Sequence, residues 1–284
     1  MPEIEMKMGG LVIQPSNQTV KRMTMLIWGG PGGGKTTLAC TAPGKKLLVN
    51  FDPDGPASVA GWPDVDVVDF SSVSPSTLEQ AKNSNNPLGL ASVIDNYDTI
   101  VFDSLTNIGY KTLMRGVGTT KNATVERPGL QAYGVRNALI LQLVKNTLAL
   151  TNKFNKHCIF IAHEAPPTTN DDGVVLYITL ALGGQLPDQA ALDFSEVWNV
   201  ADMGAGRNRR IMIRPARNKK PCKTRMFQTS GEPEFEWSFD PDDLEDTNNM
   251  TIAGWFEAWK ANGMKKLPLP NSKEYLAMIK TLEK

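Results

Sequence analysis

A complete phosphate-binding loop lies near the start of the chain. Residues 29–36 read GGPGGGKT, which fits the pattern G-x-x-x-x-G-K-[ST] in full. Glycines let successive backbone N–H groups converge on phosphate oxygens, and a helix that begins at the lysine adds its N-terminal dipole. We expect Lys35 to reach the β- and γ-phosphates of ATP and the Thr36 hydroxyl to ligate Mg²⁺. The other expected nucleotide contacts are Gly29, Gly30, Pro31, Gly32, Gly33, Gly34 and Thr37.

Acidic residues follow two other apolar runs. Hydrolysis of ATP needs a carboxylate on the magnesium side and a group that orients the attacking water. Asp103 ends the run YDTIVFD, and the carboxyl end of a buried strand faces the crevice where open α/β sheets bind ligands. We assign Asp103 to Mg²⁺; a helix N-cap at Asp103 or Ser104 is the alternative. Asp54 is the first choice as base and Asp52 the second, unless both acids only form the turn after KLLVN.

His163 ends a further apolar run, CIFIAH. A polar side chain at that edge of the sheet could sense the γ-phosphate. A lone histidine is more often structural, and the residues by themselves leave this alternative open.

A basic run and an acidic run follow each other later in the chain. Nine basic residues and no acid lie between positions 207 and 225, and eight acids and no base lie between 232 and 246. Like charges repel one another, and phosphates would relieve that repulsion. Alternatively, the basic run forms a solvated surface hairpin, or some of its residues bind the nucleotide of a neighbouring subunit. The residues predicted to bind nucleic acid are Arg207, Arg209, Arg210, Arg217, Lys219 and Lys220.

The order of the elements predicts an α/β fold with a mainly parallel sheet flanked by helices. The predicted strands are 23–28, 46–50, 65–70, 97–103, 158–162, 196–200 and 210–214, with a hairpin or flap around 171–173. The clearest predicted helices are 130–154, 252–261 and 272–282. We expect a lead-in over 1–21, an ATPase core over 22–230, and an acidic linker with a helical C-terminal extension over 231–284.

The overall composition excludes several classes of protein. The formal net charge is zero, and the three cysteines are scattered, which favours neither a zinc site nor a disulfide framework. The first residues lack the apolar core of a secretory signal, and no apolar run is long enough to span a bilayer. We therefore expect a cytoplasmic protein without a membrane partner.

Together, the segments GGPGGGKT, LLVNFDPDG, YDTIVFDSLT, GLQAYGVRNALILQLVKNTLAL and CIFIAHE resemble the small RecA-core ATPases of bacteriophages. These are recombination proteins of the single-strand-annealing type, related to RecA, RadA and KaiC. The resemblance covers roughly residues 22–230 and implies that His163 is a γ-phosphate sensor. It also implies that Lys223 and Arg225 enter a neighbouring subunit's ATP site. The base departs from the pattern, because RecA relatives usually have Glu where this chain has Asp52 and Asp54.

The resemblance implies a homo-oligomer, ring or filament, with ATP at the subunit interfaces. The expected work is ATP-dependent handling of single-stranded DNA in phage recombination, by annealing or strand exchange, alongside a single-stranded-DNA-binding protein in the host cytoplasm. One alternative is a DNA-translocating, helicase-like motor. The other is a nucleotide-switched oligomeric scaffold with no role on DNA.

Overall fold

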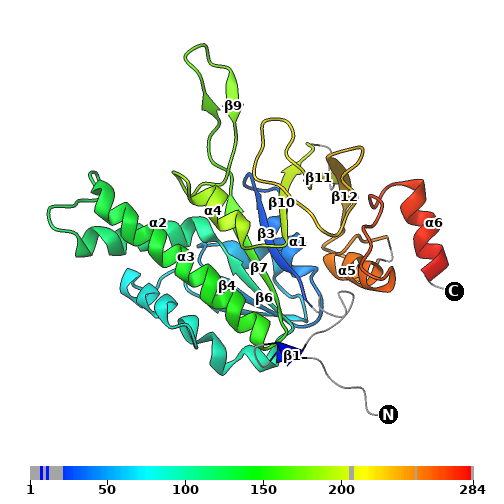
Figure 1. Ribbon diagram of the computed structural model, residues 1–284, viewed down its shortest axis with the longest axis horizontal. Coiled ribbons are helices and arrows are strands. Elements are labelled where there is room, and N and C mark those ends of the chain that lie inside the picture. Colours follow the sequence, from blue (N-terminus) through cyan, green and yellow to red (C-terminus); the bar gives the residue numbers. More distant parts are fainter. Residues whose placement is uncertain (1–6, 9–10, 13–21, 205–207, 247, 283–284) are drawn as a thin grey trace.

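A sheet of eight strands forms the centre of the protein (Figure 1). The computed structural model describes residues 7–8, 11–12, 22–204, 208–246 and 248–282. Across the sheet the strands follow the order β12-β11-β10-β3-β7-β6-β4-β5. Their bounds are β3 Thr24–Gly29, β4 Lys46–Asn50, β5 Val65–Asp69, β6 Thr99–Asp103, β7 His157–His163, β10 Glu196–Asp202, β11 Asn208–Met212 and β12 Glu234–Ser238.

The pairing of these strands confirms the expected α/β fold. All neighbours from β10 across to β5 are parallel, and β11 and β12 extend the sheet with antiparallel pairs. The central strands are buried along nearly their whole length, as strands of a parallel sheet covered on both faces must be. Because β3, β4, β6 and β7 point the same way, the loops that follow them meet at one edge of the sheet.

Helices cover both faces of the sheet (Figure 1). On one face, Ile108 and Leu143 from the two long helices α2 and α3 share a buried cluster with Phe160 of β7. On the other face, Leu38 of α1 and Trp255 of α5 belong to a second cluster. The helices are α1 Lys35–Cys40, α2 Leu105–Thr119, α3 Gly129–Lys153, α4 Leu186–Leu192, α5 Ile252–Ala261 and α6 Lys273–Leu282, with 3-10 turns η2 Gly55–Val59, η3 Pro75–Lys82, η4 Pro87–Ser92 and η5 Ile94–Asn96.

Most predicted elements are present within one to three residues of their expected bounds. Strand β4 has the predicted bounds, whereas the strand expected over 210–214 is β11, two residues earlier. Helix α4 and strand β12 were not predicted. No helix in the described part of the chain is long and apolar enough to cross a membrane.

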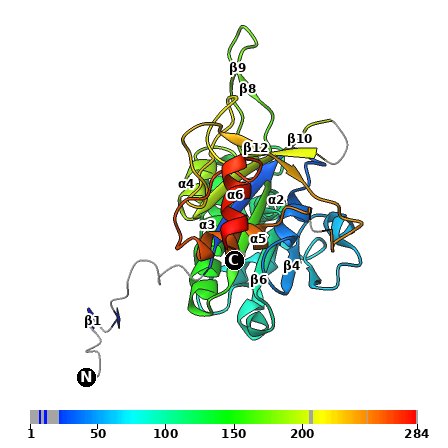
Figure 2. The ribbon, with the colours of Figure 1, turned by 90° about the vertical axis from the view of Figure 1, so that its right-hand side faces the viewer.

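A narrow hairpin extends away from the body of the protein (Figures 1 and 2). It consists of β8 (Thr168–Thr169) and β9 (Val175–Tyr177), which pair antiparallel, and it matches the hairpin predicted around 171–173. A second small antiparallel pair, β1 (Lys7–Met8) and β2 (Leu11–Val12), lies near the N-terminus. The longer hairpin starts just after β7, so it leaves the sheet at the same edge as the phosphate loop.

The segment 231–284 contributes to both the sheet and the core. Strand β12 comes from the acidic run and pairs with β11 of the basic run. In α5, the Trp255 ring lies 5.8 Å from Trp198 and 5.5 Å from Phe235, measured between ring centroids. The first turn of α5 also caps the end of α1, because Ile252 and Ala253 donate backbone N–H groups to the Thr41 hydroxyl and carbonyl, each over 3.0 Å.

We predict that Trp255→Ala destabilises the whole core, because it leaves a cavity among buried aromatic rings. The expected loss is about 3–5 kcal/mol in the free energy of unfolding, measured by urea denaturation. Leu276→Ala on α6 is the control, since Leu276 is 56% exposed and should change stability by about 0.5 kcal/mol or less. Equal, small losses for both variants would show that α5 is not part of the cooperative core.

Candidate nucleotide site

The phosphate loop joins the end of β3 to the start of α1 and packs tightly against β10. A Cβ atom on Gly29 would lie 2.0 Å from the carbonyl oxygen of Val200, so only glycine fits there. Gly34 has a φ of +83°, in the left-handed region that favours glycine. The Lys35 side chain extends back over the loop, and its ammonium donates a hydrogen bond to the Gly30 carbonyl over 2.8 Å. The loop therefore has the backbone expected of a phosphate cradle.

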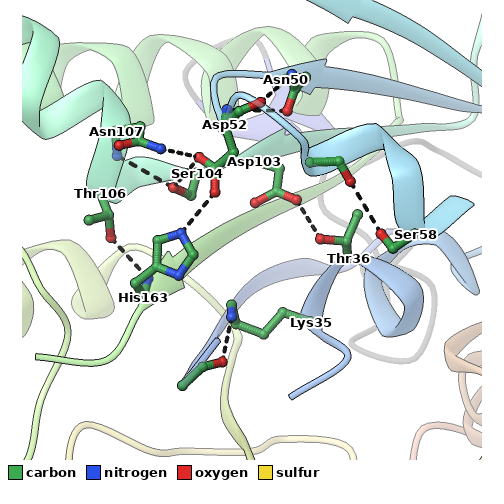
Figure 3. A network of polar contacts seen from close by, with 12 residues as sticks. Lys35, Thr36, Asn50, Asp52, Ser58, Asp103, Ser104, Thr106, Asn107 and His163 are labelled. Atoms are coloured by element: carbon green, nitrogen blue, oxygen red, sulfur yellow. Dashed lines mark hydrogen bonds and ion pairs between the residues drawn. The ribbon is translucent and has the colours of Figure 1, made fainter. Parts of the chain in front are cut away.

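Thr36 and Asp103 meet at the mouth of this loop (Figure 3). The Thr36 hydroxyl donates to Oδ2 of Asp103 over 2.5 Å, and Asp103 is 2% exposed at the end of β6. Burial raises the pKa of Asp103 to about 6, although the Thr36 hydrogen bond opposes the shift. Burial also lowers the pKa of the Lys35 ammonium, against the attraction of Asp103. A hydroxyl and a carboxylate are hard oxygen ligands that fit Mg²⁺, and a cation there would favour the ionised form of Asp103.

Asp52 is the centre of a second set of hydrogen bonds beside Asp103 (Figure 3). Its Oδ1 accepts from Oγ of Ser104 over 2.8 Å and from Nδ2 of Asn107 over 2.6 Å. Its Oδ2 lies 2.8 Å from Nε2 of His163. Burial alone would raise the pKa of Asp52, but the hydrogen bonds to His163, Ser104 and Asn107 outweigh it and hold the pKa below its usual value. Asp52 is therefore ionised at neutral pH.

Asp54 lies outside this network. It is exposed, and its backbone carbonyl, not its side chain, accepts the first hydrogen bond of η2, from Ala57. The turn is shaped by Asn50, whose Nδ2 donates to the Asp52 carbonyl over 2.7 Å and to Oδ1 of Asp69 over 3.1 Å. The first of these bonds holds the backbone of the turn from which the Asp52 side chain contacts His163. The structure thus brings the second-ranked acid into the site and leaves the first-ranked acid outside.

His163 and Glu164 connect the site to the root of the hairpin. The His163 backbone N–H donates to the Thr106 hydroxyl over 2.9 Å, and its carbonyl accepts from Ala181 over 2.8 Å where the chain returns from the hairpin. Glu164 Oε2 binds Nζ of Lys219 over 2.7 Å. His163 thus lies where the hairpin begins, and its carbonyl is bonded to the segment that returns from the hairpin.

Three residues of the basic run, Arg210, Arg217 and Lys219, are paired with acids among the described residues. Glu234 of β12 binds both Arg210, over 3.1 Å, and Arg217, over 2.7 Å. The acidic run thus lies beside the basic run and reduces its net charge. Arg207 lies outside the described residues.

The remaining basic candidates have different neighbours. Lys219 pairs with Glu164, as described above. Lys220 lies 4.8 Å from the ring centroid of Tyr177 on the hairpin. Arg209 packs against the phosphate loop, where a Cβ added at Gly34 would lie 2.6 Å from its Nε. The structure therefore divides the predicted nucleic-acid residues among three places.

Lys223 and Arg225 lie toward the opposite edge of the sheet. Lys223 forms a bridge with Val197, which pairs with Leu26 in the first half of β3, whereas the phosphate loop follows the end of β3. Burial lowers the pKa of Lys223, and the charge of Arg225 adds to this effect. The two cations thus affect each other's charge, and part of β3, from Leu26 to Gly29, separates Lys223 from the start of the phosphate loop of its own chain.

Several residues of the site were not predicted. These residues support the predicted residues through hydrogen bonds. Each lies within four positions of the end of β4, β6 or β7, and this position was the sequence signal that could have identified them. They are Asn50, Thr106, Asn107 and Glu164.

The chain was compared with curated proteins, solved structures and protein-family models. No curated protein matches the chain. Among solved structures, it is similar to a KaiC-like protein from the hyperthermophilic archaeon Pyrococcus horikoshii OT3, with 17% identity and a TM-score of 0.40, over 77% of this chain and 86% of that one. A family model described as AAA domain matches residues 21–226, a span that contains the phosphate loop, Asp52, Asp103 and His163. The chain therefore belongs to the AAA domain family and has a P-loop ATPase core.

Proposed function

We propose that this protein hydrolyses ATP at the loop formed by residues 29–36. The observation that carries the proposal is that Lys35, Thr36–Asp103 and Asp52–His163 converge from the ends of four parallel strands, β3, β4, β6 and β7, on one edge of the sheet (Figure 3). Lys35 binds the β- and γ-phosphates, and the oxygens of Thr36 and Asp103 hold Mg²⁺. When bound, Mg²⁺ neutralises the charge that develops on the phosphates.

Asp52 is the better candidate for the base that orients the attacking water. A carboxylate has about four acceptor positions, and Asp52 uses three of them for Ser104, Asn107 and His163. The fourth is left for a water, and the lowered pKa of Asp52 keeps the group ionised. His163, bound to the same carboxylate, is then placed to respond to the γ-phosphate.

We predict that Asp52→Asn lowers the rate of ATP turnover by about 100-fold or more, a typical contribution of a general base, while ATP still binds. Asp54→Asn is the matched control, and its rate of ATP turnover should stay within a few-fold of the wild-type rate. Steady-state phosphate release and the binding of a fluorescent ATP analogue measure the two effects. The reverse ranking of the two variants would return the role of base to Asp54.

The work that we propose for ATP hydrolysis is the handling of single-stranded DNA in phage recombination, by annealing or strand exchange, alongside a single-stranded-DNA-binding protein. Support comes from the hairpin, whose root holds His163. Tyr177 and Lys220 lie together there, and an exposed ring beside a cation suits an unpaired base and its phosphate. A translocating motor remains the alternative if hydrolysis drives directional movement along DNA.

We predict that Tyr177→Ala weakens the binding of single-stranded DNA by about 5- to 150-fold, the value of stacking one base. Lys220→Ala should weaken it too and reduce the salt slope by roughly 0.7, as expected for one lost phosphate contact. Lys260→Ala is the control, because Lys260 also lies over a ring, that of Phe256, far along the chain in α5. A protein that binds no single-stranded DNA at low salt would favour the scaffold alternative.

We also propose that the protein works as a homo-oligomer in which Lys223 and Arg225 complete a neighbour's site. Their position supports this, because Lys223 lies level with the first half of β3 and not at its end, where the phosphate loop of the same chain begins. Two cations on one γ-phosphoryl group would stabilise the transition state of hydrolysis.

A mixing experiment tests this arrangement. We predict that Lys35→Ala and the double variant Lys223→Ala/Arg225→Ala are each inactive, and that mixing them restores part of the ATPase rate. Restoration follows because an intact loop then meets intact cations from its neighbour. Full ATPase activity of the double variant alone would exclude the role in the neighbour's site.

A further inference from the structure

Arg209 lies on the flank of the phosphate loop away from the acids. Its guanidinium lies 5.4 Å from the ring centroid of Trp237 on β12. Its other neighbour is Gly34, where an added Cβ would lie only 2.6 Å from Nε of Arg209. The guanidinium is thus enclosed between a ring on one strand and the backbone of the loop.

The hydrogen-bonding groups of Arg209 are incompletely used. Its Nη1 is buried and, among the described residues, has no hydrogen-bond partner. A buried donor of a charged group without an acceptor is costly. Arg210 and Arg217, by contrast, bind Glu234. An arginine held beside a phosphate loop with an unused N–H is suited to a phosphate oxygen.

The order of the strands indicates which phosphate it would meet. The loop follows β3, with β7 and β6 on one side and β10 and β11 on the other. Asp103 and His163, on the first side, define the end that holds Mg²⁺ and the γ-phosphate. Arg209 approaches from the second side, so it would meet the phosphates that ATP and ADP share.

We propose that Arg209 binds the α- or β-phosphate of the nucleotide held by the loop of its own chain. Its guanidinium edge donates to a phosphate oxygen, and Trp237 and Gly34 fix the plane of the group. The proposal rests on the proposed function, because it requires the loop to bind ATP. It also separates Arg209 from any DNA-binding surface.

The test compares the affinities of fluorescent ATP and ADP analogues for three kinds of variant. Arg209→Ala should weaken both nucleotides equally, by about 10-fold or more, and Arg209→Lys should restore part of the affinity. His163→Ala should weaken ATP more than ADP. Arg115→Ala is the control and should change neither, because Arg115 lies on α2 and pairs with Glu79 of η3.

The possible outcomes are distinct. Nucleotide affinity unchanged by Arg209→Ala, or a loss confined to single-stranded DNA, overturns the proposal. So does a loss confined to ATP, because it would place Arg209 at the γ-phosphate. If the alanine variant does not fold, Arg209→Gln takes its place with the same expected loss. Lys35→Ala tests the proposed function separately: if it leaves ATP binding intact, the loop is not the nucleotide site and both proposals fail.

Discussion

The hydrogen bond between Thr36 and Asp103 joins the phosphate loop to the acid-bearing strand, and the rest of the site depends on it. Asp103 is almost completely buried, and a buried carboxylate without a partner would be unstable. The bond offsets part of that cost and fixes α1 relative to β6, although β7 lies between β6 and β3. Ser104 and Asn107, just beyond Asp103, then hold Asp52. One buried acid thus connects the loop, the expected metal ligands and the candidate base.

Much of the fold could be predicted from the sequence. The strands of a parallel sheet that is covered on both faces are buried, so they are short apolar runs in the sequence. Strand β12 was missed for a physical reason. Its sequence, EFEWS, alternates the core residues Phe235 and Trp237 with Glu234, which pairs with arginines, and the exposed Glu236. The two acids belong to the longer acidic run 232–246, which is typical of a solvated linker. The two-residue period was the signal that was available.

Some residues of the candidate site could be predicted because their type and position suit few other roles. The glycines and Lys35 of the loop, and the acid at the end of β6, belong to this group. Asp54 was ranked before Asp52, but both follow the same strand, and their positions depend on how Asn50 bonds to the turn, which the sequence does not show. The basic run shows another limit. The basic residues of 207–225 are close in sequence and were predicted to form one surface. Strand β12 brings Glu234 beside them, and Glu234 pairs with two of them.

The contact between α5 and the end of α1 has a consequence for how the protein is made. Helix α1 has six residues, too few to be stable alone, and its end is capped by Ile252 and Ala253 through Thr41. During synthesis the phosphate loop emerges early, but these partners emerge more than 200 residues later. The helix that carries Lys35 and Thr36 acquires its final support only when most of the chain has left the ribosome, so the ATP site is among the last parts of the core to be completed.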